Sequence, residues 1–461
     1  MKTSIILNAD SYKASHYLQY PEHTSVVSSY IEPRGGKFDK VLFFGLQAFL
    51  KEYLCHPITQ ADIDEGEQVI TAHGLPFNRA GWEYILEHHD GYLPLEIEAV
   101  PEGSLIDNHN VLLQVRNTDP KCYWLTSYVE TALLRSIWYP STVATQSFHI
   151  RQVLQDNMRE TCATLDKLPF MLHDFGARGA TTFEASCIGG MAHLVSFQGT
   201  DTMSALMAAR RYYSAEMAGY SVPAAEHSTI TTWGKDGERE AYENMLRQFS
   251  KPGALVSVVS DSYDLWYAID QIWGNDLKQA IQESGGTLVI RPDSGDPVTV
   301  VRETIQRLMG IFGYELVNGY RVLPECIRVI QGDGITYNSI QAILDSMKEA
   351  HLSADNVVFG MGGALLQKLD RDTLQWAMKA SAVCVNGIWR DVYKDPVTDH
   401  GKRSKRGLLA LIEDPHQGHR TIRKQDLNDR ENLLRTVYRN GQLLIEHTFE
   451  AIRERALKEK N

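Results

Sequence analysis

The histidine at position 227 stands among residues that suit chemistry. Glu226 precedes it, and hydroxyl groups follow at Ser228 and Thr229. A neighbouring carboxylate can hold an imidazole in one tautomer, and a histidine held in this way can act as a nucleophile or transfer a proton. The chain contains 16 histidines, most of which we expect to be structural. The neighbours therefore carry the prediction that His227 and Glu226 are catalytic.

Two acidic motifs offer carboxylates for a sugar or a metal. Asp293 lies in Arg291-Pro-Asp-Ser-Gly, and Asp333 lies in Gln331-Gly-Asp-Gly. Carboxylates in such loops can bind ribose hydroxyls or Mg²⁺, which prefers one or two carboxylates together with substrate phosphates. Aspartate is also a favoured helix cap, and on sequence alone capping remains an alternative for both residues.

A glycine-rich turn and a basic segment offer sites for phosphate. In Phe359-Gly-Met-Gly-Gly the glycines let backbone N–H groups approach an anion, although a tight turn would need the same residues. The basic residues that follow are Arg371, Lys379, Lys394, Lys402, Arg403, Lys405 and Arg406. These residues could bind a polyphosphate, or they could simply form a solvent-exposed charged face. Phe175 and Tyr12 are aromatic residues in polar settings, which suit stacking on a flat ligand or simple burial.

These motifs follow short apolar runs that recur along the second half of the chain. Seven runs end in glycine or polar clusters, at residues 170–176, 193–201, 255–261, 287–295, 327–334, 356–363 and 381–387. Segments of helical length separate most of them. Apolar strands that alternate with helices are typical of parallel strands buried on both faces, and seven runs favour a barrel. In that fold the active site lies at the strand ends, so the motifs predict a site for a phosphorylated sugar there.

The expected organisation is an irregular α/β barrel, similar to a TIM barrel, plus a mixed α+β domain. Residues 1–168 mix short strands and helices without regular alternation. We place the barrel at residues 169–386 and assign residues 387–461 to the first domain, which is then built from both ends of the chain.

Composition limits the other classes of function. The net charge of −12 argues against a nucleic-acid binder with a basic surface. No signal peptide and no membrane-spanning stretch is apparent, so we expect a cytoplasmic protein without a membrane partner. Six scattered cysteines without a CxxC pair suggest neither a zinc site nor a disulfide framework.

Several longer motifs resemble the nicotinamide phosphoribosyltransferase family. They are Asp10-Ser-Tyr-Lys, His16-Tyr, Phe43-Phe-Gly-Leu-Gln, Trp138-Tyr-Pro, His173-Asp-Phe-Gly-Ala-Arg-Gly, Gly199-Thr-Asp, Gly219-Tyr-Ser-Val-Pro-Ala-Ala-Glu-His-Ser, Ile290-Arg-Pro-Asp-Ser-Gly and Ile330-Gln-Gly-Asp-Gly. The resemblance covers nearly the whole chain. It implies a pentosyltransferase of NAD salvage that joins phosphoribosyl pyrophosphate and nicotinamide into nicotinamide mononucleotide and pyrophosphate. It also implies Mg²⁺ on the pyrophosphate, ATP as a coupling co-substrate that phosphorylates His227, and a homodimer with active sites at its interface.

The resemblance assigns expected roles to individual residues. Phe175 would stack on the pyridine ring, Tyr12 of a partner subunit would cover the other face, and Asp201 would accept a hydrogen bond from the carboxamide. The expected ligands of the phosphate, the ribose and its ring are Arg178, Gly332, Gly362, Gly363, Asp293, Asp333 and Arg291, and the expected pyrophosphate-side cations are Arg34, Arg371, Lys394 and Lys402. Asp10, Ser257, Arg328 and Lys379 complete the expected substrate-binding set.

Two alternatives remain at this stage. The first is nicotinate phosphoribosyltransferase activity in the same fold, and Asp201 is the residue that discriminates, because a carboxylate there repels nicotinate. The second is a non-catalytic signalling or scaffold protein. The intact set of chemical residues argues against it.

Overall fold

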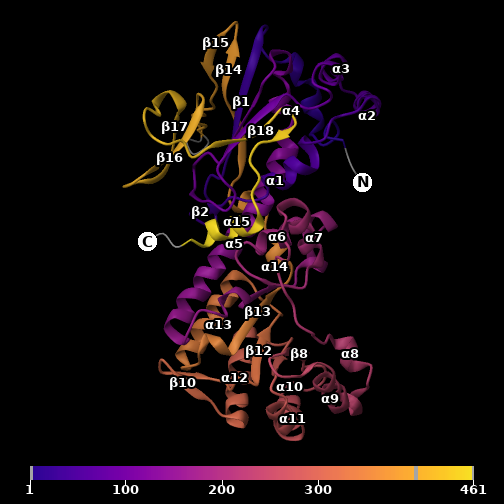
Figure 1. Ribbon diagram of the computed structural model, residues 1–461, viewed down its shortest axis with the longest axis vertical. Helices are drawn as coiled ribbons and strands as arrows, with labels where there is room; N and C mark the ends of the chain where they lie inside the picture. The colour runs from indigo at the N-terminus through magenta and orange to yellow at the C-terminus, as the bar shows by residue number, and fades with distance from the viewer. Residues whose placement is uncertain (1–3, 399–402, 459–461) are drawn as a thin grey trace. The chain divides into compact units, whose positions relative to one another are not determined.

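The computed structural model describes residues 4–398 and 403–458, and the chain divides into two compact units. One unit comprises residues 1–145, 209–215 and 370–461, and the other comprises residues 146–208 and 216–369. The second is called the barrel unit below. Figure 1 shows the helices and strands of both. The domain boundaries that we expected near residues 168 and 386 remain a prediction.

The barrel unit is built on a six-stranded parallel sheet. Its strands, in spatial order, are β7 (Gly199–Thr200), β6 (Leu172–Asp174), β13 (Val357–Met361), β12 (Ile327–Gln331), β9 (Thr287–Arg291) and β8 (Leu255–Val259). All five neighbouring pairs are parallel. Parallel bridges then join Gly199 to Tyr220 and Ala224 to Ser257, so the segment 220–224 connects the two edge strands. The predicted barrel fold is confirmed, with this segment completing an irregular ring.

The prediction that residues 381–387 form a seventh barrel strand is wrong. These residues belong largely to β14 (Ala377–Val385), which pairs antiparallel with β1 (Thr24–Glu32) in the other unit. An apolar run shows that a strand is buried but does not identify its partner. The last position in the ring is taken instead by the segment 220–224, which is too irregular to be read as a strand from its sequence.

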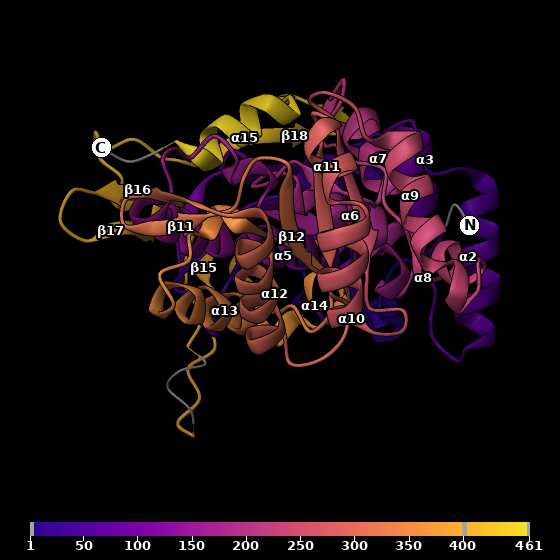
Figure 2. The same ribbon diagram turned by 90° about the horizontal axis from the view of Figure 1, so that it is seen from below.

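Helices surround this sheet. They include α6 (Phe183–His193), α9 (Glu238–Phe249), α12 (Pro297–Phe312) and α13 (Tyr337–Glu349). Asp296 caps α12 by accepting a hydrogen bond from the Thr299 amide at 2.9 Å, and Pro297 occupies the first turn, where no amide donor is needed. Figure 2 shows α12 beside α13, and the two helices are in contact.

The first unit contains a seven-stranded sheet made from both ends of the chain. Its order is β15 (Ile388–Asp391), β14, β1, β5 (Leu113–Asn117), β3 (Leu95–Ala99), β18 (Arg435–Arg439) and β19 (Gln442–Leu443). β2 (Lys40–Leu42) pairs with β4 (Leu105–Asp107), and β16 (Leu409–Asp414) pairs with β17 (Gly418–Arg423). The unit also contains α1 (Leu46–Phe49), α2 (Gln60–Ala72), α3 (Arg79–His88), α4 (Leu125–Tyr128), the first part of α5 (Glu130–Thr161) and α15 (Phe449–Leu457).

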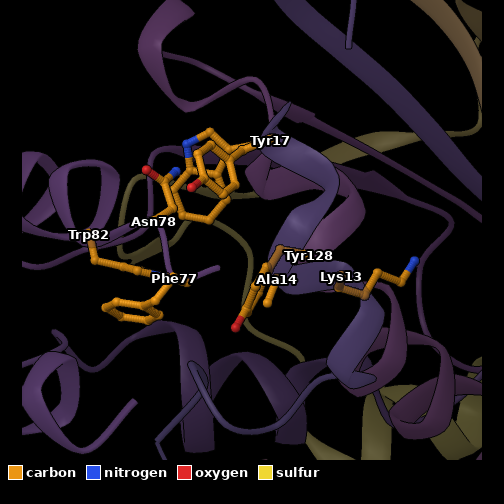
Figure 3. Close-up of a pocket in the computed structure, with 8 residues that line it drawn as sticks. Lys13, Ala14, Tyr17, Phe77, Asn78, Trp82 and Tyr128 are labelled. Carbon is orange, nitrogen blue, oxygen red and sulfur yellow. The ribbon is translucent and has the colours of Figure 1, made fainter. Parts of the chain in front are cut away.

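An aromatic cluster packs α3 against α4 in this unit (Figure 3). The Trp82 ring meets the rings of Trp124 and Tyr128 edge to face, with centroids 4.8 and 5.1 Å apart. The hollow between these rings and Phe77 encloses essentially no volume that a water molecule could occupy. The cluster is therefore packed core rather than a ligand site.

None of the helices in the two described ranges combines the length and apolar character of a membrane-spanning helix.

Candidate active site

The chemical residues of the barrel unit gather at the carboxyl ends of its strands, an edge called the rim below. Because neighbouring strands are parallel, the loops that follow them leave the sheet on the same side. These loops carry Asp174 and Phe175 at the end of β6, Asp201 after β7, Asp261 after β8, Asp293 after β9, Asp333 after β12 and Gly362 after β13.

The Phe175 ring is fixed between a glycine and an arginine. Its backbone amide donates to the Met361 carbonyl at 3.0 Å. A Cβ atom on Gly360 would lie 2.0 Å from Cε2 of the ring, so only glycine fits at this point of β13. The Arg291 guanidinium lies 5.7 Å from the ring centroid, which is within cation–π range. Gly360 and Arg291 therefore confine the ring at the rim, where it is only partly buried.

Asp201 is held by contacts from two sides. Its backbone amide donates to the Asp174 carbonyl at 3.0 Å, and the Ser221 hydroxyl donates to its Oδ1 atom at 2.5 Å. Asp174 lies below, fully buried, and its Oδ1 atom accepts from the Gly176 amide at 2.7 Å. Burial raises the pKa of the Asp174 carboxyl to about 6. The exposed Asp201 carboxylate thus faces solvent in a fixed orientation.

Arg291 and Asp293 form an ion pair over the end of β9. Nε and Nη2 of Arg291 lie 2.9 and 2.8 Å from Oδ1 of Asp293. A Cβ atom on Gly332 would lie 3.4 Å from the same guanidinium, so β9 and β12 approach closely here. The Asp333 backbone carbonyl accepts from the Gln331 side chain at 2.9 Å, and its own side chain is exposed. Arg291 and Asp293 are therefore paired at the end of β9, and Asp333 follows the adjacent strand β12.

The glycine-rich turn lies against the short 3₁₀ helix Ala177–Gly179. A Cβ atom on Gly179 would be 3.0 Å from Cα of Gly363, while a Cβ on Gly363 itself would meet nothing within 4 Å. Arg178 is exposed in the same 3₁₀ helix. Backbone amides and a cation are thus brought together in open space, which is the arrangement that a phosphate group needs.

His227 begins α8 (His227–Thr231) and contacts an aspartate that we did not predict. Its Nε2 atom lies 3.0 Å from Oδ1 of Asp261, whose side chain is 6% exposed. Glu226, the predicted partner, instead accepts a hydrogen bond from the Ser228 hydroxyl. The residue that orients the imidazole is therefore Asp261.

Ser257 lies within β8 and fixes the approach to His227 through its backbone. Its amide donates to the Pro223 carbonyl and its carbonyl accepts from the Ala225 amide, both at 2.9 Å. The side chain is buried.

Arg328 lies apart from the predicted site. It is near the amino end of β12, where Nη1 donates to the carbonyls of Leu323, Pro324 and Ile327 and Nη2 donates to Asp355 at 3.1 Å. The rim is at the opposite end of the strand. This position gives Arg328 a structural role rather than contact with substrate.

The first unit contains a cationic cavity of about 480 Å³. Its lining includes four of the predicted substrate-binding residues, Arg34, Arg371, Lys379 and Lys394. Burial lowers the pKa of the Lys379 ammonium; the Glu130 carboxylate opposes this shift, and the neighbouring cations add to it. Lys402 lies outside the described residues. The cavity is suited to a polyanion.

Asp10 and Tyr12 lie at the start of the same unit. The Asp10 carboxylate accepts from the Thr131 hydroxyl at 2.7 Å, and the Tyr12 side chain is 56% exposed. The Tyr12 ring meets His16 edge to face at 4.9 Å, and the Lys13 ammonium lies 5.3 Å from its centroid. Tyr12 therefore presents an aromatic surface to solvent.

Three residues of the rim escaped the sequence analysis: Asp261, Ser221 and Gly360. The first ends the run 255–261 and the second lies beside the Pro-Ala-Ala-Glu-His motif, so both stood in segments that had been singled out. Their roles depend on contacts across the rim, and sequence spacing does not show such contacts. Gly360 stood in the glycine-rich motif, but its packing against the Phe175 ring could not be read from the sequence.

Comparison with known proteins identifies the class and then the family. The nicotinate phosphoribosyltransferase (NAPRTase) family model matches residues 170–442, and the model of the nicotinamide phosphoribosyltransferase N-terminal domain matches residues 4–97. The chain is 52% identical over 460 residues to a nicotinamide phosphoribosyltransferase of Xanthomonas campestris pv. campestris, covering 98% of each chain. It is 35% identical to one of Acinetobacter baylyi, covering 97% of this chain and 96% of that protein.

A solved structure supports the fold independently. The nicotinate-nucleotide pyrophosphorylase of Pyrococcus furiosus shares 16% sequence identity, covers 98% of this chain and 95% of its own, and gives a TM-score of 0.62. Fold, rim and family model together define a phosphoribosyltransferase enzyme. The chain belongs to the nicotinamide phosphoribosyltransferase family.

Proposed function

We propose that this enzyme transfers the phosphoribosyl group of 5-phosphoribosyl 1-pyrophosphate to the ring nitrogen of nicotinamide, in NAD salvage. The products are nicotinamide mononucleotide and pyrophosphate. The observation that carries the proposal is the pairing of a fixed aromatic face, Phe175, with a fixed carboxylate, Asp201, on one rim. The two relatives named nicotinamide phosphoribosyltransferase support the proposal.

Asp201 provides the preference for an amide over an acid. Its Oδ1 atom receives the Ser221 hydroxyl, and no hydrogen bond to Oδ2 is found among the described residues. The carboxamide NH₂ of nicotinamide can donate to Oδ2, whereas the carboxylate of nicotinate would place two negative charges together. At about 4 Å and an effective dielectric constant of about 20, that repulsion costs roughly 4 kcal/mol. The pocket therefore favours nicotinamide.

The remaining rim residues suit the phosphoribosyl group. Arg178 and the amides of Gly362 and Gly363 would hold its 5-phosphate, while Asp293 and Asp333 would accept hydrogen bonds from its hydroxyls. As the bond between C1 and pyrophosphate breaks, positive charge develops on the ribose. Fixed carboxylates stabilise that charge, and positioning of both substrates supplies much of the remaining rate enhancement.

Mg²⁺ fits the same arrangement. The exposed Asp333 carboxylate offers the hard oxygen ligand that this ion prefers, and substrate and water would complete its coordination. When bound, Mg²⁺ would neutralise charge on the leaving pyrophosphate.

We further propose that ATP phosphorylates His227. Asp261 accepts a hydrogen bond from the Nε2–H group, which leaves the lone pair of Nδ1 free to attack the γ-phosphorus of ATP as ADP leaves. The side chain is 48% exposed, so a nucleotide can reach it. Hydrolysis of the phosphohistidine would couple ATP to product formation.

The cationic cavity of the first unit, with Tyr12, is assigned here to a homodimer. Arg34, Arg371, Lys379 and Lys394 would receive the pyrophosphate side of the substrate, and Tyr12 would cover the second face of the pyridine ring of the partner subunit's site. Lys402 is proposed to join the cations. Velocity sedimentation tests the homodimer, because the sedimentation coefficient should be that of two chains. We expect the enzyme to be cytoplasmic.

A product assay tests the reaction. Purified protein is mixed with phosphoribosyl pyrophosphate, Mg²⁺ and either nicotinamide or nicotinate, and mononucleotide is separated by chromatography. Mononucleotide from nicotinamide is expected. Equal turnover of nicotinate would support nicotinate phosphoribosyltransferase activity, which the description of the family model over residues 170–442 names. No product from either base would overturn the enzymatic proposal.

A labelling assay tests the coupling step separately. Incubation with γ-labelled ATP should give acid-labile protein label in the wild type, and His227→Ala should lose it. Retention of the label in His227→Ala would refute the assignment of this histidine while leaving the transfer reaction untouched.

A further inference from the structure

Outside the rim and the cationic cavity, His89, Asp119 and Cys122 come together in the first unit. His89 follows α3, while Asp119 and Cys122 lie at the ends of the segment that forms the 3₁₀ helix Pro120–Cys122. One ligand atom of each residue lies within 4.8 Å of the other two, and Nε2 of His89 lies 2.9 Å from Oδ2 of Asp119. None of the three is a predicted active-site residue.

We infer that these three residues bind one Zn²⁺ ion. Imidazole, carboxylate and thiolate are the ligand types that zinc takes, at bond lengths of about 2.0–2.3 Å, and a tetrahedral site with three protein ligands leaves the fourth position to water. Ligand atoms in such a site lie roughly 3.3–3.7 Å apart. The observed cluster reaches this geometry by small side-chain movements.

The surroundings of Asp119 resemble the outer shell of a metal site. Its Oδ1 atom accepts from the Lys121 amide at 2.8 Å, and the Tyr84 hydroxyl lies 3.0 Å from Oδ2. Hydrogen bonds of this kind orient ligating carboxylates. The Lys121 ammonium lies over the Tyr84 ring, 4.5 Å from its centroid. The positive charge of Lys121 would repel a bound metal ion.

Charge balance favours the ion. The Cys122 side chain is fully buried. On binding, zinc would take the place of the thiol proton of Cys122, which passes to solvent, and Nε2 of His89 would supply a lone pair to the ion. One thiolate and one carboxylate would then balance the two positive charges, so the partly buried site would carry no net charge.

The ion would tie two chain segments together. His89 ends α3, and the 3₁₀ helix leads into α4, whose Tyr128 ring packs on Trp82 of the same α3. Binding would hold these segments in their folded arrangement. We therefore expect zinc to raise the thermal stability of the protein by mass action. The cysteine spacing gave no sign of this site because only one of its ligands is a cysteine and His89 lies 30 residues before Asp119.

The experiment is a Co²⁺ titration of the full-length, chelator-treated protein without Mg²⁺. One thiolate-to-cobalt charge-transfer band is expected per chain, with bleaching by Zn²⁺ and a Tm increase of a few degrees. Cys122→Ala should lose the band, and His89→Gln should weaken binding by about tenfold or more. The matched control Cys326→Ser, which alters a half-buried thiol elsewhere, should behave as wild type.

Two outcomes would overturn the inference. One is the absence of a stoichiometric band in wild-type protein that is folded by circular dichroism. The other is a band that persists in Cys122→Ala. If Cys122→Ala does not fold, the half-buried position of His89 makes His89→Gln the deciding variant, and unchanged Co²⁺ affinity there would reject the site.

Discussion

The most direct perturbation of the rim is Gly360→Ala, because one methyl group would collide with the Phe175 ring. The added Cβ would lie 2.0 Å from Cε2 and 2.2 Å from Cδ2. Ordinary carbon contacts are about 3.5–4.0 Å, so the ring must move by roughly 1.5 Å. The φ angle of Gly360 is not positive, so backbone strain does not contribute and the collision alone sets the effect.

Two quantities should change. Overpacking costs about 1–3 kcal/mol of folding stability. A displaced ring loses its stacking on the bound pyridine, which is worth about 0.5–1.5 kcal/mol. Since 1.4 kcal/mol is tenfold, the KM for nicotinamide should rise roughly two- to tenfold. The KM for phosphoribosyl pyrophosphate should change little.

Steady-state kinetics and chemical denaturation measure both effects. The matched control is Gly310→Ala in α12, where a Cβ meets nothing within 4 Å, and it should stabilise the protein by about 0.5–1 kcal/mol. Combining Gly360→Ala with Phe175→Leu should recover stability but not the KM. Wild-type KM and wild-type stability in Gly360→Ala would show that the ring does not occupy the position described.

Further predictions concern the rim and the cationic cavity. Asp201→Asn should raise kcat/KM for nicotinate relative to nicotinamide by at least about tenfold, since it removes a charge repulsion of roughly 4 kcal/mol, and competition between the two bases measures this ratio. Asp261→Asn should slow labelling of His227 by γ-labelled ATP by about tenfold or more, measured as the initial rate, and an unchanged rate would contradict the proposed tautomer. Asp174 has a pKa raised from 3.8 to about 6, so its stabilising contribution is complete below pH 3.8 and is lost as pH rises through 6. In urea denaturation, the free energy of unfolding of Asp174→Asn should therefore rise by up to about 3 kcal/mol relative to that of the wild type between pH 4 and pH 7. If the difference between the two unfolding free energies stays constant over this range, the pKa shift is refuted. Lys379→Met should raise the KM for phosphoribosyl pyrophosphate about tenfold without changing that for nicotinamide, because it removes one cation from the cavity.

Much of the barrel could be predicted because parallel strands buried on both faces give continuous apolar runs. Six of the seven predicted runs contribute to the parallel sheet or end at its rim. The seventh, residues 381–387, failed because an inner strand of an antiparallel sheet, here β14 between β15 and β1, can show the same apolar pattern. Strand pairing is a long-range property, and local periodicity does not determine it.

The sequence by itself determined the residue types at the rim, because a loop that directly follows a parallel strand must leave the sheet at its carboxyl end. Asp293 and the glycines at 362 and 363 could therefore be named before their positions were known, and His227 could be named from its polar neighbours. Tertiary structure alone decided which groups meet. It placed Asp261 on His227, Ser221 on Asp201 and Gly360 under Phe175, and it took Arg328 to the far end of its strand. The physical reason is that hydrogen bonds and steric contacts act over a few ångströms in space, whereas the groups that make them lie tens to hundreds of residues apart in the chain.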